Sequence, residues 1–155
     1  ETIDLSKTKI VGCLQDLRLC FALRVLKLKE TAVTGDVALF ERLPHIVEVH
    51  VGNTNIFGDM FSLSSCKKVE VISLPYTSVT GDISRFNDFE KLESVDMGFT
   101  QLSGSIDDID THVHLREFIL EETRIGGDMI SLSRLSKLRS LNLCGTQVKG
   151  SILVL

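Results

Sequence analysis

The sequence predicts an α/β repeat solenoid: a right-handed coil with a parallel β-sheet on its concave face and short 3₁₀, helical or irregular segments on its convex face. The first supporting observation is a threonine that recurs every 23 residues, at Thr8, Thr31, Thr54, Thr77, Thr100, Thr123 and Thr146. The second is a glycine with the same spacing, at Gly12, Gly35, Gly58, Gly81, Gly104, Gly127 and Gly150. Neither series contains an insertion or a deletion, so about seven repeats cover the whole chain.

A short strand is predicted just before each threonine, because apolar residues alternate there with other types. The stretch 69–82 reads VEVISLPYTSVTGD and carries Ile72 and Leu74, and the equivalent pair one repeat earlier is Val49 and Val51. Alternation with a period of two is typical of a strand with one buried face. Stacked copies of this strand predict the parallel sheet.

After each glycine the chain is predicted to return along the convex side. Apolar residues stand two, five, eight and eleven positions after the glycine, and this three-residue step suits a 3₁₀-like segment. An aspartate follows four of the glycines, at Asp36, Asp59, Asp82 and Asp128. We expect these carboxylates to accept hydrogen bonds from amides at the start of the return, and the threonine hydroxyls to satisfy backbone groups at the turn.

The repeat V-x-x-I-x-L-x-x-T-x-V-x-G-D resembles the leucine-rich repeat family over the whole chain, with threonine where asparagine is usual. The phrase T-G-D-I is similar to the plant-type L-T-G-x-I-P repeat, one residue shorter and without its proline. The resemblance implies one domain over residues 1–155 that binds another protein, but it does not identify the partner.

Both ends of the sequence fall inside a repeat. Ile3 and Leu5 already occupy strand positions, and Leu155 stands in mid-repeat. Because terminal repeats of solenoids usually carry a cap, we expect the sequence to be a segment of a longer chain or to have ends that another molecule covers.

Composition and motifs argue against several function classes. The net charge of -4 provides no basic surface for nucleic acid, and no apolar run is long enough for membrane insertion. The acidic run Asp107-Asp108-Ile109-Asp110 is interpreted as a solvated convex loop, and a calcium ladder on the aspartate column is disfavoured because Ser105 and Ser151 interrupt it. His112 is the one polar residue in an inward column. Because the sequence offers no further zinc ligands at a suitable spacing, His112 is expected to face solvent or to bond to the backbone. We therefore predict no enzyme activity, no metal and no cofactor.

The cysteines favour an intracellular reducing compartment or organelle over secretion. Cys20 and Cys66 share an inward column two repeats apart, roughly 10 Å, which is too far for a disulfide. Cys13 and Cys144 lie at opposite ends of the predicted solenoid. The sequence has no pairs of flanking cysteines and no N-x-S/T glycosylation motif.

The outward positions of the concave strands form a grid, and its centre is the candidate binding surface. Tyr76 and Phe99 are adjacent along the stack, next to Pro75 and Gly98, and exposed aromatic residues without long neighbours are typical of interface hot spots. Lysines at 7, 27 and 29 flank the pair on one side, and acidic residues at 96, 117, 121 and 122 flank it on the other, so a partner with the opposite polarity would be oriented. The predicted binding residues are Tyr76, Phe99, Val71, Ser73, Pro75, Asp96, Ile119, Glu121, Lys27 and Lys29.

Three functional interpretations remain open. The first is a non-catalytic recognition module that binds a protein or peptide on the concave sheet. The second is a structural subunit of a large multiprotein complex, held through apolar residues at nominally outward convex positions: Leu19, Phe21, Ala38, Leu39, Phe61, Ile130, Leu153 and Val154. The third, which the plant-type resemblance suggests, is a receptor-type sensing ectodomain. On the alternative interpretation of the aromatic pair, both rings fold over the sheet edge and cover the turn.

Overall fold

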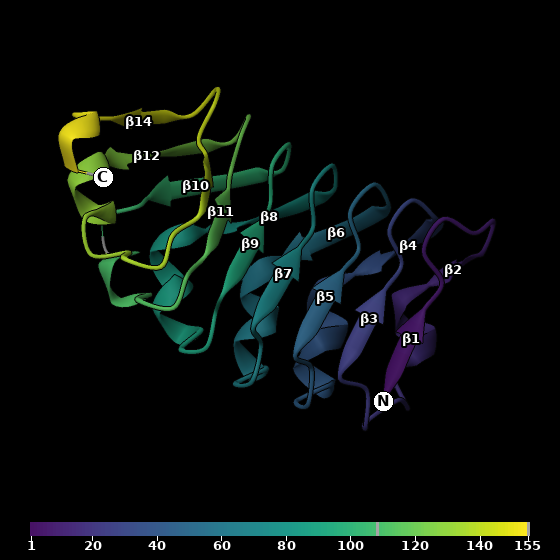
Figure 1. Ribbon diagram of the computed structural model, residues 1–155. Helices are drawn as coiled ribbons and strands as arrows, with labels where there is room; N and C mark the ends of the chain where they lie inside the picture. Colours follow the sequence, from purple (N-terminus) through teal and green to yellow (C-terminus); the bar gives the residue numbers. More distant parts are fainter. Residues whose placement is uncertain (108, 155) are drawn as a thin grey trace.

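The computed structural model (Figure 1) describes residues 1–107 and 109–154, with the side chains of all of these except Asp110 and Val154. Each repeat contributes two short strands and a 3₁₀ segment. The first strands are β1 (Thr2–Asp4), β3 (Val25–Lys27), β5 (Glu48–His50), β7 (Val71–Ser73), β9 (Ser94–Asp96), β11 (Glu117–Ile119) and β13 (Ser140–Asn142). The second strands are β2 (Val11–Cys13), β4 (Ala32–Asp36), β6 (Asn55–Asp59), β8 (Ser78–Asp82), β10 (Gln101–Ser105), β12 (Arg124–Asp128) and β14 (Gln147–Lys149). The 3₁₀ segments are η1 (Leu14–Leu17), η2 (Val37–Arg42), η3 (Met60–Ser65), η4 (Ile83–Asp88), η5 (Ile109–Thr111), η6 (Met129–Leu132) and η7 (Ile152–Val154).

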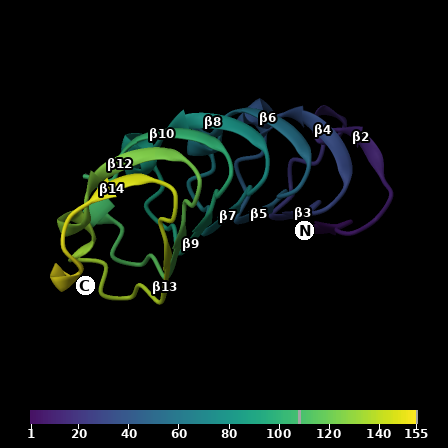
Figure 2. The same cartoon turned by 90° about the horizontal axis from the view of Figure 1, so that it is seen from above.

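The first strands form the concave sheet, in the order β1-β3-β5-β7-β9-β11-β13. All of its strand pairs are parallel, and each residue pairs with its equivalent in the next repeat, as Val71 does with Ser94. Figure 2 shows that the stack curves and that these strands lie on the inner side of the curve. The predicted concave sheet and the 3₁₀ returns are confirmed.

The second strands form another parallel sheet of seven strands, which the sequence analysis did not predict. It placed a turn at the threonine and the start of the convex return after the glycine, and it predicted no strand between them. In β8, however, Val79 is fully buried between the exposed Ser78 and Thr80, which is the period-two pattern of a strand. Stacking of equivalent stretches from neighbouring repeats supplies the backbone hydrogen bonds that one isolated stretch lacks.

The threonine column closes the turn after each concave strand. Every one of the seven threonines donates from Oγ1 to the backbone carbonyl three residues earlier, at 2.6 or 2.7 Å. Thr77 is 8% exposed and donates to the Leu74 carbonyl. The predicted structural role of this column is therefore confirmed.

The glycine and aspartate columns connect neighbouring repeats to the 3₁₀ segments. Gly81 has a φ of +146°, and a Cβ there would lie 2.6 Å from Cγ of Met60 in the preceding repeat. The Asp82 carboxylate accepts a hydrogen bond from the Ser84 amide at 2.9 Å, and this bond holds the pKa of Asp82 below its ordinary value. Equivalent bonds at Asp36, Asp59 and Asp128 confirm the predicted capping.

His112 is buried, at 5% exposed, so the solvent-facing alternative is wrong. Its ring hydrogen-bonds the backbone carbonyl of Phe86 and lies edge-on to the Phe86 ring, with centroids 6.4 Å apart. Nε2 has no hydrogen-bond partner among the described residues. Burial lowers the pKa of His112, and the bond to Phe86 opposes this shift only in part.

Two of the convex apolar residues were predicted to face outward but do not face solvent. Leu39 is 4% exposed and belongs to the core, because η2 and η3 are six-residue segments that pack side by side. Phe61 is partly buried beneath Arg85, whose guanidinium carbon lies 3.3 Å from the ring centroid. By contrast, Leu19, Phe21, Ile130 and Leu153 are exposed. The expectations for Asp108, Leu155 and the side chains of Asp110 and Val154 lie outside the described residues.

Candidate functional site

Tyr76 and Phe99 form a stacked pair beside the concave sheet. Their ring centroids are 4.3 Å apart and the ring planes differ by 10°. This separation is close to the spacing of roughly 4.8 Å between neighbouring strands, so equivalent positions in adjacent repeats favour stacking. Tyr76 is 52% and Phe99 is 38% exposed, which leaves a flat apolar surface open to solvent.

The backbone under the two rings is fixed in an uncommon conformation. The residue before each threonine from Thr8 to Thr123 is left-handed, with φ between 53° and 58°: Lys7, Glu30, Asn53, Tyr76, Phe99 and Glu122. For bulky residues such as Tyr76 and Phe99 this conformation is unfavourable, whereas asparagine tolerates it. The amides still extend the sheet ladder, because Tyr76 N–H donates to Gly98 and Phe99 N–H to Glu121.

Beside the pair, the sheet surface is flat because small or compact residues occupy one column. Pro75 is buried, so it supports the surface and does not offer an exposed contact. A Cβ at Gly52 would lie 2.8 Å from Cγ of Pro75, and one at Gly98 would lie 2.9 Å from Cγ of Glu121. Val71 and Ser73 on β7 and Ile119 on β11 are partly exposed beside this column.

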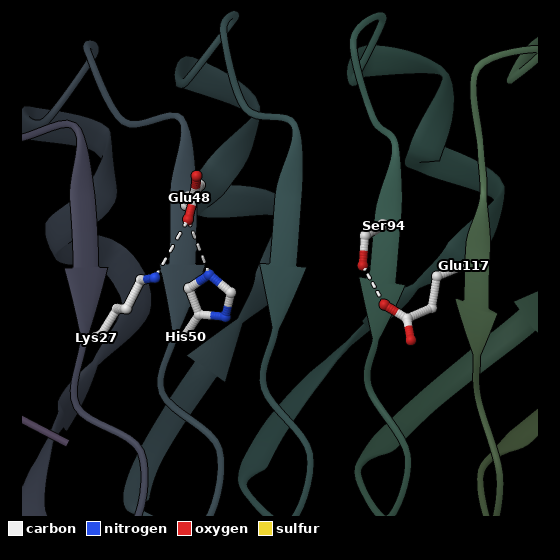
Figure 3. A network of polar contacts seen from close by, with 5 residues as sticks. All are labelled: Lys27, Glu48, His50, Ser94 and Glu117. Carbon is white, nitrogen blue, oxygen red and sulfur yellow. Dashed lines mark hydrogen bonds and ion pairs between the residues drawn. The ribbon is translucent and has the colours of Figure 1, made fainter. Parts of the chain in front are cut away.

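On the side toward β1, most of the positive charge already has a partner. Lys27 Nζ lies 3.7 Å from Glu48 Oε2, and His50 Nε2 lies 3.1 Å from the same oxygen (Figure 3). Lys7 pairs with Glu30 at 3.8 Å. Lys29 is exposed and forms no ion pair within the part of the chain that the structure describes.

On the side toward β13, several carboxylates lie near one another, and the side chains that donate hydrogen bonds to them are uncharged. Ser94 donates to Glu117 at 2.6 Å (Figure 3), and Asn142 donates to Glu121 at 2.8 Å. Asp96 on β9 is partly buried, and burial raises its pKa. Repulsion from Glu117 and Glu121 adds to the increase, while the Gly98 amide and the Lys29 ammonium oppose it.

The structure thus brings nearly all of the predicted residues onto one surface, with Lys27 and Lys29 at one side and Asp96 and Glu121 at the other. The predicted set omitted the polar partners that hold the charged side chains in place: Glu48, His50, Ser94, Glu117 and Asn142. All five stand in the outward strand columns of the predicted grid, and Glu117 is one of its flanking acidic residues, but the grid alone did not show that they contact the charged side chains. It also omitted Phe57, which is 46% exposed on β6 of the second sheet.

Nothing in the described part of the chain assembles a metal centre, since no three histidine, cysteine or acidic side chains come together in a metal-binding group there. All four cysteines are free. Along residues 1–107 and 109–154, no helix has the length and apolar character needed to cross a membrane. The surface offers stacking, hydrogen bonding and charge, which are the means of recognition.

No family model matches the chain, and no curated protein matches its sequence. Several solved structures do match the fold of the chain. The Arabidopsis receptor kinase HAESA, in complex with the peptide hormone IDA and the co-receptor SERK1, superposes with a TM-score of 0.85 at 22% identity over 98% of this chain. The leucine-rich-repeat ectodomain of the Arabidopsis thaliana receptor kinase GASSHO1/SCHENGEN3, in complex with CASPARIAN STRIP INTEGRITY FACTOR 2, gives 0.82 at 20% identity over 95%.

The chain has the leucine-rich-repeat fold. An internalin from Listeria monocytogenes agrees, with a TM-score of 0.79 at 19% identity over 96% of this chain. The leucine-rich-repeat chain described here spans 26% of the HAESA chain, 20% of the GASSHO1 chain and 42% of the internalin chain. At these identities the likeness shows the shared fold, and the function must be argued from the site.

Proposed function

We propose that this leucine-rich-repeat chain is a non-catalytic interaction module that binds a protein or peptide on its concave sheet, around Tyr76 and Phe99. The observation that carries the proposal is the exposed ring stack on a left-handed backbone. The left-handed conformation belongs to the turn of six repeats, but of these positions only Tyr76 and Phe99 carry aromatic rings, and both rings remain exposed as interface hot spots require. HAESA and GASSHO1, which share the fold, have peptide or protein ligands in their structures, and this supports a recognition role.

The test compares the wild-type chain with Tyr76→Asn/Phe99→Asn as bait in extracts of the source cells. Each aromatic hot spot contributes on the order of 2 kcal/mol to binding, so the double variant should bind a captured partner at least about 100-fold more weakly. Ile130→Ser is the matched control, because it removes an exposed apolar side chain from η6 without changing the concave sheet. If the double variant retains every partner at wild-type affinity, the concave binding surface is wrong.

A structural subunit of a multiprotein complex is the second candidate. It is favoured by exposed apolar residues away from the concave sheet: Leu19 at 71%, Phe21 at 56%, Ile130 at 56% and Leu153 at 92%. On this alternative, Ile130→Ser should release the protein from its assembly and Tyr76→Asn/Phe99→Asn should not. Gel filtration with light scattering on the native protein measures the difference. The receptor-ectodomain alternative draws only on the fold shared with the receptor kinases.

A further inference from the structure

We infer that the occupant of the concave face is an extended peptide segment that places an arginine near Asp96, Glu117 and Glu121 and an acidic side chain near Lys29, on either side of an apolar group over Tyr76 and Phe99. This inference rests on the proposed function and specifies the chemistry and orientation of the partner. Four observations carry it: the unpaired carboxylates, the distribution of positive charge, the flat central column and the length of the surface.

The acidic side has no cation within ion-pair distance among the described residues, and Lys29 attracts Asp96 only from farther away. Glu117 and Glu121 accept hydrogen bonds from the neutral Ser94 and Asn142, and Asp96 accepts one from the Gly98 amide at 3.5 Å. Within the described residues, none of the three carboxylates forms an ion pair. Burial and mutual repulsion raise the pKa of Asp96, so a cation placed among the three would relieve an unfavourable interaction.

Arginine suits this position better than lysine. Its guanidinium is planar, carries five N–H donors and is more weakly hydrated than an ammonium group. Ser94 and Asn142 each occupy one carboxylate oxygen of Glu117 and Glu121, so the other oxygen of each remains available as an acceptor. One guanidinium can therefore donate hydrogen bonds to both carboxylates at the same time.

The basic side offers less unpaired charge to a partner than the acidic side does. This difference predicts which of the partner's two charged groups contributes more to affinity. Lys27 pairs with the carboxylate of Glu48, which also hydrogen-bonds His50, so the charge of Lys27 is already partnered within the protein. Of Lys7, Lys27 and Lys29, only Lys29 forms no ion pair within the described residues, although its charge also attracts Asp96. The acidic group of the partner should therefore contribute less affinity than its arginine.

The central column admits a main chain. Gly52, Pro75 and Gly98 are all buried, because the Pro75 ring packs against Gly52 and the Glu121 side chain packs against Gly98, so no side chain of these three residues protrudes and a peptide main chain can lie across this low surface. Lys29 follows β3 and Glu121 follows β11, four strands further along the concave sheet. That separation is roughly 19 Å, which an extended segment of about six residues spans. The stacked rings, which follow β7 and β9, lie between the two charged ends.

The experiment is a selection of random ten-residue peptides, displayed on phage, against the wild-type chain and two variants. Glu117→Gln/Glu121→Gln removes the charge but keeps acceptors for Ser94 and Asn142. Glu41→Gln/Glu90→Gln removes the same charge away from the concave sheet and serves as the matched control. Tyr76→Asn/Phe99→Asn tests whether the selected peptides use the proposed surface at all.

Peptides selected on wild type and on the control should carry an aromatic or large apolar residue with arginine on one side and aspartate or glutamate on the other. On Glu117→Gln/Glu121→Gln, the arginine preference should disappear while the apolar residue remains. In a synthetic selected peptide, replacing arginine with alanine should weaken binding to wild type about tenfold or more and should change binding to the charge variant little.

Two results would overturn the inference in distinguishable ways. If the selected peptides need Tyr76 and Phe99 but show the same arginine frequency on the charge variant, the inferred chemistry is wrong and the proposed function stands. If the peptides bind Tyr76→Asn/Phe99→Asn as well as wild type, or none is enriched, both the inference and the concave binding surface fail.

Discussion

Replacing both stacked rings with asparagine should remove binding while changing stability little. Asparagine is the right substitute because Asn53 already occupies the same column with a φ of 53°. The substitution therefore keeps a side chain that the left-handed position accepts and removes only the aromatic surface. This separation matters, because a variant that unfolds would lose binding for a trivial reason.

The stability change can be worked from the structure. The rings are 52% and 38% exposed, and full burial of such a side chain contributes about 1.5 to 3 kcal/mol. With the stacking contribution of about 0.5 to 1.5 kcal/mol for the pair, removing each ring costs about 1 to 2 kcal/mol. Relief of left-handed strain returns about 1 kcal/mol or more at each position. The net loss for the double variant should remain below about 2 kcal/mol.

Urea unfolding followed by circular dichroism measures this change, and thermal unfolding should show a decrease of less than about 8 °C. Glu30→Asn is the matched control, since it changes the backbone preference in the same column without removing a ring and disrupts only an exposed ion pair. If the rings instead cover the turn as part of the core, the two truncations together should cost more than about 6 kcal/mol. A measured loss above about 4 kcal/mol would therefore refute the binding interpretation.

Three further predictions concern buried or partly buried polar groups. Thr77→Val should destabilise the protein by about 1 to 2 kcal/mol, because the Leu74 carbonyl loses its 2.7 Å hydrogen bond; Thr77→Ser should retain most of the stability in urea unfolding, and equal losses in both would contradict this. His112→Leu should stabilise by about 1 to 3 kcal/mol, since it removes the unpartnered Nε2. The stabilisation by His112→Leu should grow as the pH falls below the ordinary histidine pKa of 6.5, because the unfolded chain then binds a proton and the folded ring, with its lowered pKa, does not. Urea unfolding at pH 5 and pH 8 tests both expectations. No gain in stability at pH 5 would refute the reasoning. Asp96→Asn should raise the melting temperature at pH 7, because the raised pKa of Asp96 means that the charged form is less favourable in the folded protein than in the unfolded chain. This gain should vanish below the ordinary pKa of 3.8, where both states are protonated, and an unchanged melting temperature at pH 7 would contradict it.

Sequence analysis could predict much of the candidate site because the repeat converts spacing along the chain into position in space. Tyr76 and Phe99 are one period apart, and the parallel register places them side by side. The same reasoning predicts which charges lie at each end of the surface. It could not predict that Pro75 is buried, because coverage of a column depends on the residues in adjacent repeats, here the close approach of Gly52.

The sequence also could not give the depth of individual convex residues. Leu39 and Phe61 stand at nominally outward positions of the period. Packing of η2 against η3 buries Leu39, and Arg85 from the next repeat covers Phe61. Each outcome depends on a specific neighbour and on the length of a 3₁₀ segment, neither of which the 23-residue period specifies.

By itself, the sequence determined the solenoid, the concave sheet, the core columns, the threonine bonds and the aspartate caps. These features recur along the repeats, the aspartate caps in four of them, and depend on local spacing, so a regular period is sufficient to predict them. Only the tertiary structure decided that the T-x-V-T-G-D stretch forms a second sheet, that the two rings stack in solvent and that the Asp96 carboxylate is partly buried. Those features arise between neighbouring repeats, where backbone hydrogen bonds and side-chain coverage exist only after the repeats have stacked.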